Sequence, residues 1–237
     1  MTTDDQLERF AAALSTLGRL QLTPADDQSR TDVVELAPQW PLTACLEADS
    51  AAAEYSTAGW AELQASVTSG EAGSVVHADQ DRVYGISASA VVPPFESVHR
   101  DEEGLVFDRR TLEVRQAYRR LGLHAPKLNR EPDDHLGLEL DFLAQCCERA
   151  LDCADRGDAR LREEYLSLAR DFSSVHLLAW APAILQQAAQ AAQTHWLRGL
   201  ELLTLGSVLA WGQALGLPSP VQNEQGEYQV IRGQQEF

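Results

Sequence analysis

Apolar residues recur three or four positions apart along most of the chain, and no stretch alternates regularly between apolar and polar residues. The first such stripe comprises Leu7, Phe10, Leu14 and Leu17. A helix places residues at this spacing on one face, where they can pack against a neighbouring helix. The pattern therefore predicts an all-α fold, a single-domain helical bundle of about eight to ten helices.

Capping residues, glycines and prolines divide this pattern into separate helices. Ser50 is a favourable N-cap and Gly70 a C-terminal stop, so a helix is expected between them. The expected helices cover about 5–20, 24–37, 51–69, a segment ending at Tyr84, a segment from after Gly104 to Gly122, 134–157, 159–175 and, after a bend at 176–182, one long or once-interrupted helix from 183 to 215.

The composition indicates one helical domain followed by a short tail. Residues 1–217 share one composition and show no internal repeat at a fixed period. Pro218 and Pro220 end the last helix, and the rest of the chain is polar and rich in Gln and Glu. We therefore expect 218–237 to be a polar tail that is mobile unless a partner holds it.

The chain is strongly acidic, with 36 acidic and 19 basic residues, a formal net charge of -17 and Lys127 as its single lysine. Such a surface repels nucleic acid, which is bound mainly through Lys and Arg. It attracts a cationic peptide, because opposite charges raise the rate of encounter. The same charge is also typical of an ordinary soluble surface, so it does not by itself identify a partner.

The N-terminal residues carry no positively charged and apolar pattern of a secretory signal. The longest uncharged run, 202–217, is shorter than the roughly 20 residues that a membrane span requires, so stable membrane insertion is not expected. The four cysteines, Cys45, Cys146, Cys147 and Cys153, lack zinc-site spacing and are expected to be buried thiols. These features together predict a cytoplasmic protein.

Two loops carry the groups that suggest function. Pro93-Pro94-Phe95-Glu96-Ser97-Val98 contains two prolines and is expected to be a loop, because proline removes N–H donors and restricts the preceding residue. Glu131-Pro132-Asp133-Asp134-His135 opens a helix, and Asp133 is the expected N-cap. One cap needs one side chain, so the other carboxylates are free to bind guanidinium groups in bidentate fashion, which suits a pair of arginines.

Other interpretations of these residues remain open at this point. Acidic groups favour a helix N-terminus, and His135 in a first turn is often a capping or packing group. The cluster 131–135, with His99 or His176, would alternatively hold a divalent metal in a metal-dependent hydrolase. A nucleophile elbow and a phosphate-binding loop are both lacking from the sequence, so an enzyme of those classes is not expected.

At these two loops the sequence resembles the TorD/DmsD/NarJ-like family of redox-enzyme maturation chaperones. The family signature E-P-x-D-H is complete at 131–135, and the P-P-aromatic-E-S-V loop stands one helix earlier at 93–98. A third likeness is the H-L-L-x-W-x-P pattern at 176–182. The resemblance covers about residues 82–200, whereas the first eighty residues match the family poorly.

The resemblance implies a helical chaperone, not an enzyme and without a cofactor of its own. Its expected partner is the twin-arginine leader, and with it the catalytic subunit, of a molybdopterin oxidoreductase, which it holds for cofactor insertion before export. Matched by position, the leader-binding residues are Glu131, Pro132, Asp134 and His135 from one side and Pro94, Phe95 and Ser97 from the other. A structural helical subunit retained in a redox complex is the remaining alternative, and a homodimer stays open.

Overall fold

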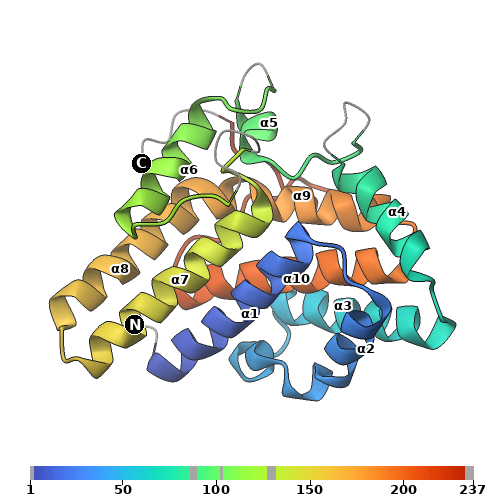
Figure 1. Cartoon of the computed structure of the whole chain (residues 1–237), viewed down its shortest axis with the longest axis horizontal. Helices are drawn as coiled ribbons and strands as arrows, with labels where there is room; N and C mark the ends of the chain where they lie inside the picture. Colours follow the sequence, from blue (N-terminus) through green and yellow to red (C-terminus); the bar gives the residue numbers. More distant parts are fainter. Residues whose placement is uncertain (1–2, 86–89, 102–103, 127–131, 233–237) are drawn as a thin grey trace.

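The structure, a computed structural model of the chain, describes residues 3–85, 90–101, 104–126 and 132–232. These residues contain ten α-helices and no β-strand, which confirms the all-α prediction (Figure 1). The helices are α1 (Asp4–Leu22), α2 (Asp27–Glu35), α3 (Ala51–Ser69), α4 (Gly73–Tyr84), α5 (Glu96–Arg100), α6 (Arg109–Arg120), α7 (Leu136–Asp155), α8 (Ala159–Phe172), α9 (Leu178–Ala191) and α10 (His195–Ala214).

Helix α10 forms the centre of the bundle. It packs against α3 on one side and α9 on another, and it also touches α1. Its sequence is apolar around most of its circumference, as expected of a helix that neighbours surround. Trp196 and Trp211 of α10 are fully buried, as is Trp180 of α9, so the three largest side chains anchor the same core.

A second contact joins α1 to α7 and thereby fixes the start of α7. Gly18 and Gly137 face each other where the two helices cross, and a Cβ atom on Gly137 would lie 2.6 Å from the carbonyl oxygen of Gly18. The two backbones can approach this closely because neither residue carries a side chain. Helix α8 then packs back along α7.

Several expected boundaries differ from those observed. The second helix is shorter than expected, covering Asp27–Glu35, because Asp26 rather than Thr23 caps it. After Gly104 the helix begins only at Arg109, where Asp108 caps it. Leu105 and Leu112, two apolar positions of the expected helix, are 56% and 54% exposed. The proline loop ends at Phe95, because α5 begins at Glu96.

The segment 176–182, expected to be a bend, is helical. A π-helix, Ser173–Leu177, continues directly into α9, which includes Pro182. The proline removes one backbone donor, but this segment is buried around Trp180, and its packing outweighs the single lost hydrogen bond. Of the two expectations for 183–215, one long helix or a helix interrupted once, the second agrees with the structure, because α9 ends at Ala191 and α10 begins at His195.

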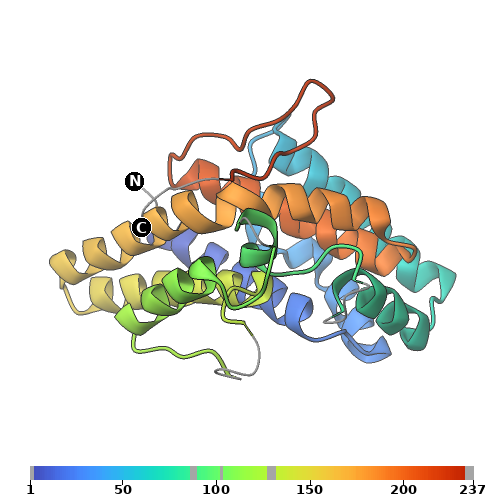
Figure 2. The ribbon, with the colours of Figure 1, turned by 90° about the horizontal axis from the view of Figure 1, so that it is seen from above.

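The tail folds back onto the helices, which its polar composition does not indicate. An isolated bridge between Gln222 and Tyr228 forms a small hairpin, and Tyr228 is buried beside Tyr55 of α3. In Figure 2 the tail is the dark red segment that leaves the end of α10, extends above the helices and returns to α9. The sequence does not predict this packing, because the contacts of Tyr228 with Tyr55 and Gln186 join residues far apart in the chain.

The structure also bears on the predictions about membrane-spanning helices and about the cysteines. No helix among the described residues is long and apolar enough to cross a bilayer. Cys146, Cys147 and Cys153 are buried and Cys45 is half-buried, all four as free thiols, which agrees with the interpretation as packed thiols.

Candidate functional site

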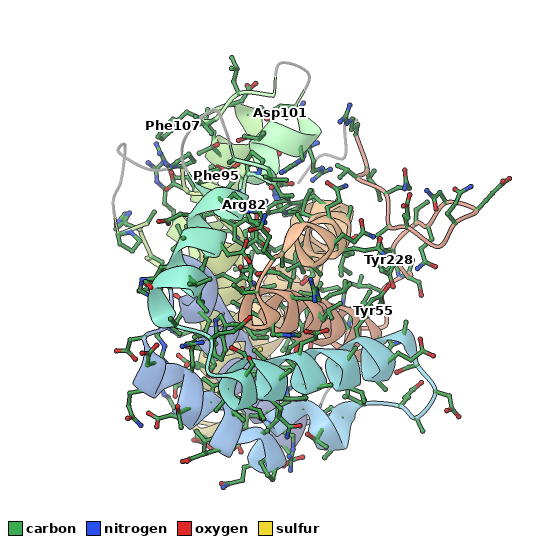
Figure 3. All side chains as sticks on the ribbon, turned by 90° about the vertical axis from the view of Figure 1, so that its right-hand side faces the viewer. Tyr55, Arg82, Phe95, Asp101, Phe107 and Tyr228 are labelled. Carbon is green, nitrogen blue, oxygen red and sulfur yellow. The ribbon has the colours of Figure 1, made fainter. Side chains whose placement is uncertain are left out.

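The two loops that the sequence singled out are joined edge to edge. Phe95 and His135 form an antiparallel bridge, in which Glu96 N–H donates to Asp134 O (3.0 Å) and Leu136 N–H donates to Pro94 O (2.9 Å). The Phe95 and His135 rings also meet edge to face, with centroids 5.3 Å apart. We call this junction, residues 93–97 with 132–135, the corner; Figure 3 shows Phe95 there, at the same end of the molecule as Asp101.

Asp134 is the link that holds the corner together. Its carboxylate is fully buried and accepts a hydrogen bond from Ser97 N–H (Oδ2, 2.7 Å) and one from the Thr111 hydroxyl (Oδ1, 2.7 Å). Burial raises the pKa of Asp134, against the opposing effect of these hydrogen bonds. The carboxylate that was expected to face arginines therefore binds α6 and the proline loop instead.

The helix N-cap is His135, not Asp133 as expected. His135 has an extended backbone, its Nδ1 accepts from Gly137 N–H (3.0 Å), and α7 begins one residue later. Asp133 is buried and pairs with Arg115 of α6 through Oδ2 (2.6 Å from Nη2), while its Oδ1 has no hydrogen-bond partner among the described residues. The arginine at this position draws Asp133 away from the helix end, and the imidazole replaces it.

Beneath the corner lies a buried ionic network. Glu96 binds Arg100 and His176 Nδ1, the latter at 2.8 Å, and all three side chains are fully or almost fully buried. Burial alone would raise the pKa of Glu96, but the charges and hydrogen bonds of His176 and Arg100 lower it. The network fixes α5 against the π-helix, because Arg100 Nη1 also donates to Val175 O (2.6 Å).

Glu139, one turn into α7, borders this network. It is fully buried, and Trp180 Nε1–H donates to its Oε2 (3.1 Å). Burial raises the pKa of Glu139 well above its usual value, and the negative charge of Glu96 raises it further. A neutral Glu139 and an ionised Glu96 can thus share the same interior.

The corner brings together the described members of the expected binding set. Pro94, Phe95, Ser97, Pro132 and Asp134 are buried there, His135 is half-buried, and Glu131 lies outside the described residues. Sequence reasoning missed the contribution of α6, whose Thr111, Arg115 and Tyr118 reach the acidic loop; Tyr118 donates to Asp133 O (3.0 Å). A helical stripe indicates a buried face but does not identify the loop that the face contacts.

The geometry around Asp133 and Asp134 is not that of a metal centre. The described parts of the chain contain no group of three His, Cys, Asp or Glu side chains arranged to hold a metal ion. Asp133 points to an arginine and Asp134 to a hydroxyl and an amide, so the two carboxylates do not converge on one point.

Several known proteins resemble part of this chain. The chaperone protein TorD of Vibrio cholerae is 32% identical over 97 residues, 41% of this chain and 42% of the relative. The probable Tat proofreading chaperone DmsD of Haemophilus influenzae is 27% identical over 128 residues, 54% of this chain and 56% of the relative. The chlorate reductase assembly chaperone protein of Ideonella dechloratans is 35% identical over 100 residues, 42% of this chain and 49% of the relative.

The chain thus spans about half the length of these relatives, and their names confirm the resemblance to TorD/DmsD/NarJ-like proteins. A broader match comes from the model of one family, described as the nitrate reductase delta subunit, which covers residues 48–186 and therefore more than half of the chain. The chain belongs to the nitrate reductase delta subunit family.

Proposed function

We propose that this chain is a cytoplasmic chaperone for the assembly of a molybdopterin-containing oxidoreductase. In this proposal it binds the twin-arginine leader of the catalytic subunit at the corner and holds the precursor for cofactor insertion before export. The observation that carries the proposal is that Phe95 and His135 pair the two loops in which the chain resembles the chaperone family. The names of the relatives, two chaperones and an assembly chaperone, support the same role.

The buried and half-exposed residues of the corner suggest different roles. Asp134 acts as a positioning residue, because both of its carboxylate oxygens already accept hydrogen bonds from Ser97 and Thr111. His135 keeps part of its ring accessible beside Phe95, and we assign it, with Glu131, to direct contact with the leader. Pro94 and Pro132 set the backbone of the two loops.

Charge favours such a partner. The net charge of -17 attracts a leader with paired arginines from a distance and speeds the encounter. Because salt screens interactions between exposed charges, the affinity should fall as the ionic strength rises.

Calorimetric titration of the purified chain with a synthetic peptide that carries a pair of arginines followed by an apolar segment tests the proposal. We expect binding that weakens with added salt and that falls when the arginine pair of the leader is replaced by glutamines. Replacing His135 by alanine should weaken binding at least about tenfold, which corresponds to roughly 1.4 kcal/mol.

His77→Ala is a matched control. His77 also makes one hydrogen bond between its ring and a backbone group, to Ala25 O (3.3 Å), but it lies on α4 rather than at the corner. Its variant should bind the leader as the unmodified chain does. A chain that binds no leader at low salt, or two histidine variants that behave alike, would contradict the proposed function.

The family description itself favours a second candidate, since it names a subunit. A chain retained as a structural subunit would co-purify with the mature exported oxidoreductase. A transient chaperone would instead be found with the precursor that still carries its leader. Isolation of both forms of the oxidoreductase from one culture distinguishes the two functions.

A further inference from the structure

The end of the tail is held by α9 and by α5, the short helix that follows the proline loop. Ile231 N–H donates to Ala179 O in α9 (2.8 Å), and Arg100 Nε–H of α5 donates to Ile231 O (2.9 Å). Ala179 O and Arg100 Nε thus bond to the main-chain N–H and C=O of Ile231, as a neighbouring β-strand would. This arrangement recognises an extended backbone whatever its side chains are.

The side chains around Ile231 give this position a chemical preference. Val230, just before it, packs partly buried against the core, and Arg232, just after it, is exposed. Arg232 lies close enough to His99 for its positive charge to add to burial, the main cause, in lowering the pKa of His99. The tail therefore presents an extended, apolar segment followed by an arginine to the Pro93–His99 side of the molecule.

The contact at Ile231 is weaker than the anchor that precedes it. Tyr228 is buried against Tyr55, and its N–H donates to Gln186 Oε1 (2.9 Å), as the labelled pair in Figure 3 illustrates. Ile231 is half-exposed, and two hydrogen bonds hold its main chain. The last described residues can therefore detach while the hairpin stays in place.

Arg100 connects this position to the corner. The same guanidinium binds Glu96, whose N–H donates to Asp134 O within the bridge between the two loops. Helix α5 has five residues, so at about 1.5 Å per residue its two ends are less than 10 Å apart. An extended peptide lying at the corner would reach Ile231 within a few residues.

We propose that Ala179 O and Arg100 Nε form a main-chain binding position for an extended cationic peptide, and that residues 230–232 of the tail occupy it as an internal ligand that the incoming peptide displaces. This inference rests on the proposed function, because the incoming peptide is the leader. The tail then lowers the apparent affinity for the leader, since part of the binding free energy is used to displace it.

Titration of three full-length chains with the same synthetic leader tests the inference. Ile231→Pro removes the N–H that Ala179 O accepts and should release the end of the tail. Glu224→Pro is the matched control, because Glu224 is exposed and follows Asn223 in the turn that Gly226 N–H closes on Asn223 O, a position that favours proline. Circular dichroism and melting temperatures verify that both variants remain folded.

We expect the Ile231→Pro chain to bind the leader about five- to tenfold more tightly than the unmodified chain, and the Glu224→Pro chain to bind it unchanged. Equal or weaker binding by Ile231→Pro would overturn the inference and leave the proposed function standing. Binding by the Ile231→Pro chain alone would support both. A leader that binds none of the three chains would overturn both.

Discussion

At the scale of single residues, Asp134 is better described as a buried connector than as an exposed acid. Its two oxygens hold Ser97 from the proline loop and Thr111 from α6, so three segments meet on one side chain. When a buried acceptor is removed, its donors stay buried without partners. The cost in stability then exceeds the net contribution of the hydrogen bonds that are lost.

Asp134→Ala should therefore lower the free energy of unfolding by about 2–4 kcal/mol, whereas Asp134→Asn should lower it by about 1 kcal/mol or less. Asparagine keeps an acceptor for Ser97 N–H, and its amide can donate to the Thr111 hydroxyl, which then acts as an acceptor. Urea denaturation monitored by circular dichroism measures both values. An alanine variant as stable as the unmodified chain would show that the corner does not depend on this residue.

Glu201 of α10 is another buried acid, and its raised pKa makes stability depend on pH. Burial raises its pKa to about 8, although Tyr84 and Gln21 donate hydrogen bonds to it. Because the folded-state pKa lies above the usual value of 4.5, the folded state favours the protonated form. The stabilisation from this protonation is complete below pH 4.5 and is lost as the pH rises toward about 8.

Glu201→Gln should remove this dependence, because glutamine is neutral at every pH and keeps an acceptor for Tyr84 and Gln21. The variant should gain stability relative to the unmodified chain as the pH rises from 5 to 9, by on the order of a few kcal/mol at the alkaline end. Thermal unfolding at several pH values checks this. A constant difference between the two proteins across the range would contradict the assignment.

At the scale of helices, the corner depends on the crossing of α1 and α7. Gly137 lies two residues after His135. Its close approach to Gly18 therefore fixes the position of the first turn of α7, and with it those of His135 and Asp134 just before the helix. A side chain at this crossing would meet backbone atoms rather than the flexible end of another side chain.

Gly137→Ala should destabilise the protein by about 1–3 kcal/mol or more, because its Cβ would meet the Gly18 carbonyl, and backbone cannot move aside easily. It should also weaken leader binding by displacing His135. Gln145→Ala, a half-buried position of the same helix that bonds Glu148, is the control and should change little. Melting temperatures of the two variants decide the matter; an unchanged value for Gly137→Ala would contradict the role of the crossing.

The sequence predicts the helices well where their pattern is local. The stripes and caps of α1, α3, α7 and α8 give their bounds to within a few residues, since Ser50, Gly70 and Asp158 act within one turn of the helix they delimit. The prediction of Asp133 as the N-cap of α7 is wrong, because Asp133 pairs with Arg115 of α6 in a long-range contact that competes with capping. The bend predicted at 176–182 is likewise wrong, because buried packing around Trp180 keeps the segment helical in spite of Pro182.

The candidate site was predictable as a set of residues but not as a set of contacts. The two loops stand out by their prolines and acids, and the bridge between Phe95 and His135 places them together. The burial of Asp134 was not predictable, because it depends on Thr111 of a helix whose orientation no local pattern specifies. The anchoring of the tail by Tyr228 was missed for the same reason.

At the scale of the whole molecule, the described helices form a bundle around α10, and the corner lies beside α5 and α6 along one edge (Figure 1). The strong negative charge acts over the entire surface and raises the rate at which a cationic segment arrives, whereas the corner determines where it binds. The attraction is therefore general, whereas the binding site is specific.

Photo-crosslinking tests directly whether the leader binds at the corner. A leader that carries a photoreactive phenylalanine two residues after its arginine pair is bound to the full chain, irradiated and digested, and the adducts are located by mass spectrometry. The account predicts adducts within residues 93–101 and 131–136. Adducts confined to α3 or to α8, with these two segments unmodified, would contradict it.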